Sequence, residues 1–61
     1  MKASELTRLA KKKGCQIKRH GADHDIWLNP KTGNTAPIPR HQSKEVATGT
    51  ANRIIKDLGL K

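Results

Sequence analysis

Three residues, Gly21-Ala22-Asp23, separate two stretches with the character of β-strands, and this short link constrains the fold more than any other feature. The first stretch runs from Cys15 to His20, with Cys15 and Ile17 expected to face inward, and the second runs from His24 to Leu28. A link this short cannot return the chain for a parallel alignment, so the two strands are expected to form an antiparallel hairpin.

A second stretch dense in turn residues, 29–34, predicts another hairpin. The residues that follow, Thr35 to Ile38, have the character of a third strand. Pro37 and Pro39 have no amide hydrogen to donate to a ladder, so this strand is expected at an edge of the sheet. Residues 39–47 are then predicted to form an exposed loop.

A helix is predicted before the strands, with Ser4 as its N-cap and Gly14 at its end. Its apolar stripe consists of Leu6, Leu9 and Ala10.

A second helix is predicted after the strands, with Thr48 as its N-cap and Gly59 as its stop. The clearest periodicity in the chain places its apolar residues at positions i, i+3, i+4 and i+7, namely Ala51, Ile54, Ile55 and Leu58. The predicted fold class is therefore α+β, in the order α-β-β-β-α, with a three-stranded antiparallel sheet and both helices on one face.

Size and charge limit the possible partners. The chain has 61 residues, enough for one domain, and 13 Lys and Arg against 5 acids give a net charge of +8. This charge favours a polyanionic partner, whether nucleic acid, an acidic protein or a membrane surface. The single Cys15 allows no internal disulfide and suits a reducing compartment, and no apolar run approaches the ~20 residues of a membrane span. We therefore expect a cytoplasmic protein outside the membrane.

If the polyanionic partner is RNA, the basic residues expected to hold it lie in three parts of the chain. The lysines at the end of the first helix could instead be a solvated cap that complements the helix dipole, and both interpretations stay open. The predicted RNA-binding residues are Lys11, Lys12, Lys13, Lys18, Arg19, Arg40 and Lys44.

Trp27 is the only aromatic residue, since the chain has no Phe or Tyr. It could stack on an RNA base, but a small domain needs its one large aromatic side chain for packing. We expect Trp27 to lie in the core, on the same side of its strand as Asp25 and opposite His24 and Ile26.

His24 is the main candidate for acid–base chemistry, because it opens a predicted strand between two carboxylates, Asp23 and Asp25. RNA supplies its own nucleophile, the 2′-OH, so cleavage needs a base, an acid and a cation beside the phosphate. Imidazole titrates near neutral pH and can act as base or acid, and a nearby carboxylate could orient the ring. The alternative for His24 is an ordinary surface or structural role.

The other two histidines are weaker candidates. His41 follows Pro39-Arg40 in the predicted loop and is expected to be either exposed or an accessory to His24. His20, at a strand end, is expected to be structural or exposed.

The potential metal ligands do not match a known site. The spacings of Cys15, His20, His24 and His41 fit no zinc motif, and no third acid accompanies Asp23 and Asp25 for magnesium. We therefore expect no metal and no cofactor.

In their order along the chain, several short motifs resemble the HicA-type toxins, small RNA-cleaving proteins of bacterial toxin–antitoxin modules. The segment Ala22-Asp23-His24-Asp25-Ile26-Trp27 aligns with the family's Gly-Ser-His-x-Ile-aromatic signature, with Ala22 and Asp23 in place of Gly and Ser. Pro39-Arg40-His41 is similar to the family's Pro-x-His after the third strand. The opening Ser-Glu-Leu, residues 4–6, and the closing segment, residues 49–60, resemble its first and last helices.

The resemblance implies that residues 1–61 form a single HicA-like domain with a double-stranded-RNA-binding-domain-like fold. It implies a toxin that cleaves mRNA as an endoribonuclease and so inhibits translation, with His24 as the catalytic residue. It also implies a neutralising HicB-type antitoxin, which the net charge of +8 leads us to expect to be acidic on its contacting face. The alternative is a non-catalytic RNA-binding module of the same fold.

Overall fold

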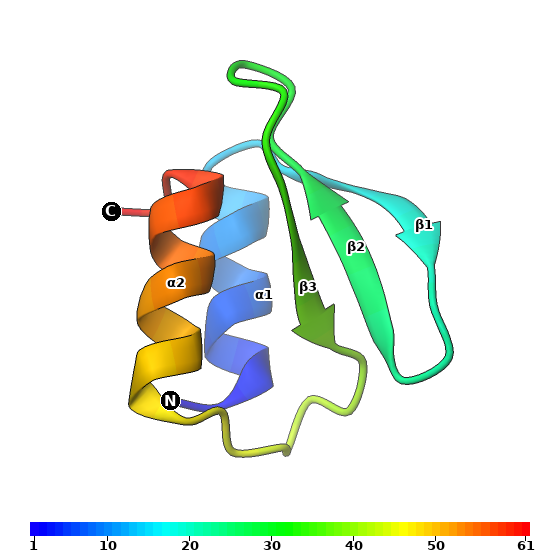
Figure 1. The fold of residues 1–61 in the computed structure, drawn as a ribbon, viewed down its shortest axis with the longest axis vertical. Helices are drawn as coiled ribbons and strands as arrows, with labels where there is room; N and C mark the ends of the chain where they lie inside the picture. The colour runs from blue at the N-terminus through cyan, green and yellow to red at the C-terminus, as the bar shows by residue number, and fades with distance from the viewer.

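The computed structural model describes residues 1–61, and its elements follow the predicted order α-β-β-β-α (Figure 1). The strands form one antiparallel sheet in the order β1-β2-β3. The elements are α1 (Ala3–Lys12), β1 (Gln16–His20), β2 (His24–Leu28), β3 (Thr35–Pro39) and α2 (Thr48–Leu58). The predicted fold class is confirmed, and no helix is long and apolar enough to cross a membrane.

The two helices lie side by side on one face of the sheet, over β3 rather than over its centre (Figure 1). Both helices contact β3, whereas β1 is the strand furthest from them and all five of its residues are exposed. The hydrophobic core consequently lies between the helices and the β2–β3 half of the sheet.

The core includes the only aromatic residue. Leu6, Ile38 and Leu58 are completely enclosed, and Trp27 is only 5% exposed, which confirms its predicted place in the core. Cys15 is also buried, as predicted, and burial raises the pKa of its thiol.

Ile17 does not reach this core, so its predicted burial is wrong. It pairs with Trp27 across the β1–β2 ladder and therefore points to the helix side of the sheet, yet it is 41% exposed. The reason is that the helices do not extend over β1, and the register also shifts between Ile17 and Arg19. An alternating pattern predicts which side a residue faces, but not whether anything covers that side.

The first helix begins before the predicted cap. Its N-cap is Lys2, and Ser4 lies in the first turn, so the predicted cap is wrong. The amides of Ala3 and Ser4 donate instead to backbone carbonyls of the loop before α2, those of Lys44 at 2.9 Å and Gln42 at 3.0 Å. These carbonyls therefore satisfy helix amides that a capping side chain would otherwise satisfy, and the two bonds fix the loop against α1.

The second helix begins at Thr48 with Ala47 as its N-cap, one residue before the predicted cap. It ends as predicted at Gly59, whose left-handed backbone (φ of 63°) suits glycine. The buried Asn29 side chain donates to the Leu58 carbonyl at 2.8 Å and so ties the second hairpin to the end of α2.

Candidate active site

The turn between β1 and β2 sets the position of His24. The amide of Gly21 donates to the His24 carbonyl at 2.8 Å, and a Cβ atom added to Gly21 would lie only 2.8 Å from that oxygen. Position 21 therefore requires glycine. No residue other than glycine has a positive φ, so Ala22 adopts its place in the turn without backbone strain.

His24 is the first residue of β2 and is exposed. It pairs with Pro39 of β3, and strand alternation directs it away from the side on which Trp27 is buried. It lines a hollow of about 390 Å³ together with Pro37, Pro39 and Lys44, at the edge where β3 meets the start of α2. None of the side-chain hydrogen bonds or ion pairs of the protein involves the His24 ring, so both ring nitrogens are available to a ligand.

The carboxylate expected beside His24 is elsewhere. Asp25 faces the helix side of the sheet, and its side chain is only 13% exposed. Its Oδ1 accepts hydrogen bonds from His20 Nδ1 at 2.7 Å and from Arg40 Nε and Nη2 at 3.1 and 3.0 Å. We call His20, Asp25 and Arg40 the Asp25 cluster. The hydrogen bond from His20, together with the bonds and positive charge of Arg40, lowers the pKa of Asp25 below its ordinary value.

Asp23 and His41, the other possible accessory residues, are exposed, and their backbone carbonyls accept hydrogen bonds from nearby amides. The carbonyl of Asp23 accepts the amide of Arg40 at 3.1 Å, and that of His41 accepts the amide of Lys44 at 3.1 Å.

The predicted RNA-binding residues are distributed over several faces of the molecule. Lys44 shares the hollow with His24, whereas Lys18 and Arg19 line another hollow with Ile26 on the side of the sheet away from the helices. Lys12 and Lys13 are exposed at the end of α1.

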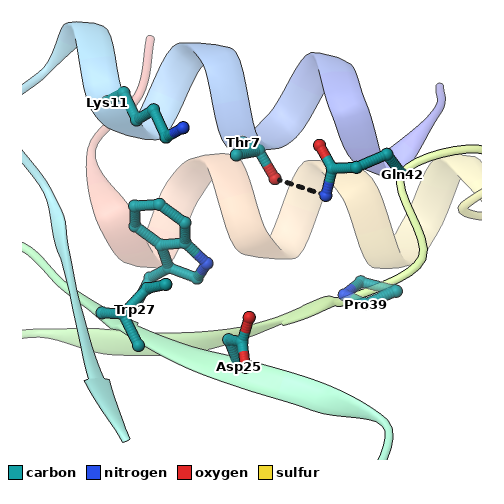
Figure 2. Close-up of a pocket in the computed structure, with 7 residues that line it drawn as sticks. Thr7, Lys11, Asp25, Trp27, Pro39 and Gln42 are labelled. Atoms are coloured by element: carbon teal, nitrogen blue, oxygen red, sulfur yellow. Dashed lines mark hydrogen bonds between the residues drawn. The ribbon is translucent and has the colours of Figure 1, made fainter. Parts of the chain in front are cut away.

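Lys11 lies apart from these, in a groove of about 340 Å³ between α1 and the sheet (Figure 2). Trp27 and Asp25 form the floor of this groove, and Thr7 and Gln42 lie across it, joined by a hydrogen bond of 3.5 Å (Figure 2). His, Cys, Asp and Glu side chains nowhere gather in threes that could hold a metal ion.

The Asp25 cluster was not predicted from the sequence. His20 and Asp25 pair across the β1–β2 ladder and so share a side of the sheet, but a regular hairpin closed by the three residues 21–23 would pair His20 with His24 instead. The observed pairing depends on the register shift between Ile17 and Arg19. The role of Arg40 depends on how β3 ends beside β2.

The family of the chain follows from comparison with known proteins. A family model described as the HicA toxin of bacterial toxin–antitoxin systems matches residues 3–60. The chain belongs to the HicA toxin family. A solved structure, the crystal structure of the E. coli HicAB toxin–antitoxin complex, contains a chain that matches this HicA-family protein with a TM-score of 0.76 and 28% sequence identity. The match covers 98% of this chain and 100% of that one. No curated protein matches the sequence.

Proposed function

We propose that this HicA-family protein is an endoribonuclease that cleaves mRNA without a metal ion and so inhibits translation, with His24 as its acid–base catalyst. The observation that carries the proposal is the position of His24, the residue aligned with the histidine of the family signature. It is exposed, its ring has no partner within the protein, and it lines a hollow with a lysine.

The chemistry needs few protein groups. The RNA 2′-OH attacks the adjacent phosphorus, the O2′–P bond forms and the P–O5′ bond breaks, which leaves a 2′,3′-cyclic phosphate and a 5′-hydroxyl. The imidazole of His24 would take the 2′-OH proton or give one to the departing O5′. Lys44, on the same hollow, would stabilise the negative charge of the phosphorane.

The basic surface would hold the RNA by its backbone, since Trp27 is buried and the chain offers no other aromatic ring for stacking. The E. coli chain that this protein resembles was solved in a toxin–antitoxin complex. We propose a HicB-type antitoxin as the partner of this chain, with an acidic contacting face that covers His24 and the lysines. A substrate and partner of this kind would require the protein to act in the cytoplasm, and we propose that location.

The test is to incubate the purified protein with end-labelled RNA in EDTA and to separate the products. We expect fragments that end in a cyclic phosphate. RNA that is bound but stays intact would contradict the proposal and identify a non-catalytic RNA-binding module. Addition of the antitoxin should stop the cleavage, and a complex that still cleaves RNA would disprove inhibition by covering.

A further inference from the structure

Arg40 contacts both ends of the turn that carries His24. Its Nη2 donates to the carbonyl of Gly21, and its backbone amide donates to the carbonyl of Asp23 at 3.1 Å. The same guanidinium bridges to Asp25 Oδ1 through Nε at 3.1 Å and Nη2 at 3.0 Å. Arg40 therefore contacts the residues on both sides of His24, as well as the glycine that begins the turn.

The Asp25 carboxylate joins Arg40 to His20. It is mostly enclosed, and a carboxylate removed from water is stable only where donors replace its hydration. His20 supplies one donor at 2.7 Å, and Arg40 supplies two. Because these three donors share one oxygen of Asp25, the side chains of His20 and Arg40 are held together with little freedom to move.

The arrangement also sets one wall of the His24 hollow. Pro39 precedes Arg40, pairs with His24 across the β2–β3 ladder and lines the same hollow. Arg40 thus holds the turn that carries His24, and it is also the residue bonded directly to Pro39, which lines the hollow beside His24. A displacement of a catalytic group by ~1 Å can cost ~10²-fold in rate, so a device of this kind has a measurable effect.

We propose that Arg40, with Asp25 and His20, is a positioning residue for His24 and governs the rate of RNA cleavage rather than the affinity for RNA. This inference rests on the proposed ribonuclease function. Arg40 was expected from sequence to contact phosphate, but its positive charge faces the negative charge of Asp25 at hydrogen-bonding distance. The pair presents little net charge to a polyanion.

The experiment compares Arg40→Gln, Arg40→Lys and the parent protein in single-turnover cleavage, with RNA affinity measured over a range of salt concentrations. Arg40→Gln should lower the maximal rate by about 10- to 100-fold, while the affinity and its salt slope stay within twofold of the parent. Arg40→Lys should also be slow, because an ammonium group keeps the charge but cannot bridge Asp25 and Gly21 as the planar guanidinium does.

The matched control is Arg8→Gln, which removes the same charge from an exposed position on α1 outside the cluster. Its maximal rate should equal that of the parent. A folded Arg40→Gln protein that cleaves at the parental rate would overturn the inference. So would a parental maximal rate with weaker binding and a flatter salt slope, which would make Arg40 a phosphate contact.

If Arg40→Gln does not fold, His20→Gln is the variant that tests the inference. It removes one donor to Asp25, and the His20 side chain that it replaces is 71% exposed. Several-fold slower cleavage at unchanged affinity would support the positioning role, and the parental rate would contradict it. Failure of the proposed function is a distinct result, since the parent protein itself would then leave RNA intact.

Discussion

The two histidines that flank the Gly21–Asp23 turn have opposite surroundings. His20 is anchored by Asp25 on the helix side of the sheet, whereas the ring of His24 has no partner and lies on a hollow at the β3 edge. Sequence proximity suggested the reverse, because Asp25 is the neighbour of His24. In a strand, however, adjacent residues point to opposite sides, so the carboxylate next to His24 belongs to the histidine across the hairpin.

The difference separates β2 into two sides with different roles. Its helix side carries Asp25 and Trp27 and is buried, while its other side carries His24 and Ile26 and is more exposed. The helix side of β2 packs in the core and stabilises the fold, and we propose that RNA cleavage takes place on the other side.

The largest expected effect is on the helix side. Trp27→Ala should remove a core side chain and cost about 3–5 kcal/mol, which is comparable to the whole stability of so small a domain. The isolated variant should be largely unfolded in circular dichroism and thermal melts. Ile26→Ala, on the other side of the same strand, is the control and should melt much closer to the parent, since Ile26 is only partly buried. Equal losses from both variants would remove the distinction between the two sides.

Gly21→Ala should have the next largest effect. The added Cβ would lie 2.8 Å from the His24 carbonyl, so the turn must shift at a cost of roughly 1–3 kcal/mol, and cleavage should fall because His24 moves with it. Thermal melts and single-turnover cleavage measure the two effects. The control is Ala22→Gly, which restores the residue type of the family signature and should leave the rate unchanged. A Gly21→Ala protein with parental stability and rate would show that the turn does not position His24.

Replacement of Lys11, Lys12 and Lys13 by Gln should weaken RNA binding without slowing the bound protein. For each phosphate that the variant no longer neutralises, the slope of log affinity against log salt should become flatter by about 0.7–0.9. Filter binding at several salt concentrations, together with cleavage at saturating protein, separates affinity from rate. Unchanged affinity and slope would mean that these lysines form only a solvated helix end.

The smallest expected effect is on acid stability. The hydrogen bond from His20 and the adjacent Arg40 lower the pKa of Asp25 in the folded state, so the unfolded chain binds a proton more readily. The stability that Asp25 contributes is present above the ordinary aspartate pKa of about 3.9 and is lost as the pH falls through its lower folded pKa. Thermal melts of Asp25→Asn and the parent should differ at neutral pH and converge in acid. A difference in melting temperature that stays constant with pH would contradict the cluster. The N-terminal amino group also lowers the pKa of Glu45, but Glu45 is present in both proteins and contributes equally to their acid dependence.

Features of the fold that depend on local chemistry were predicted from the sequence. The short links predicted both hairpins, Gly59 predicted the end of α2, and the lack of other aromatic residues placed Trp27 in the core. The predictions were wrong where the outcome depends on backbone that is distant in the sequence. The Ser4 cap was wrong because carbonyls of Gln42 and Lys44 take that place, and Ile17 is exposed because no helix extends over β1. The Asp25 cluster was missed for the same reason, since it needs Arg40 from the residue after β3 and a register shift in β1.

The most direct test of the account is single-turnover cleavage of RNA by His24→Ala in EDTA, beside His24→Gln and His41→Ala. We predict that both His24 variants lose about 10²–10⁴-fold in rate, because neither side chain can exchange a proton near neutral pH. Both should keep the parental melting temperature and RNA affinity, since His24 is exposed and makes no side-chain hydrogen bond within the protein. His41→Ala should retain much of the activity. A His24→Ala protein that folds, binds RNA and cleaves it at the parental rate would contradict the account.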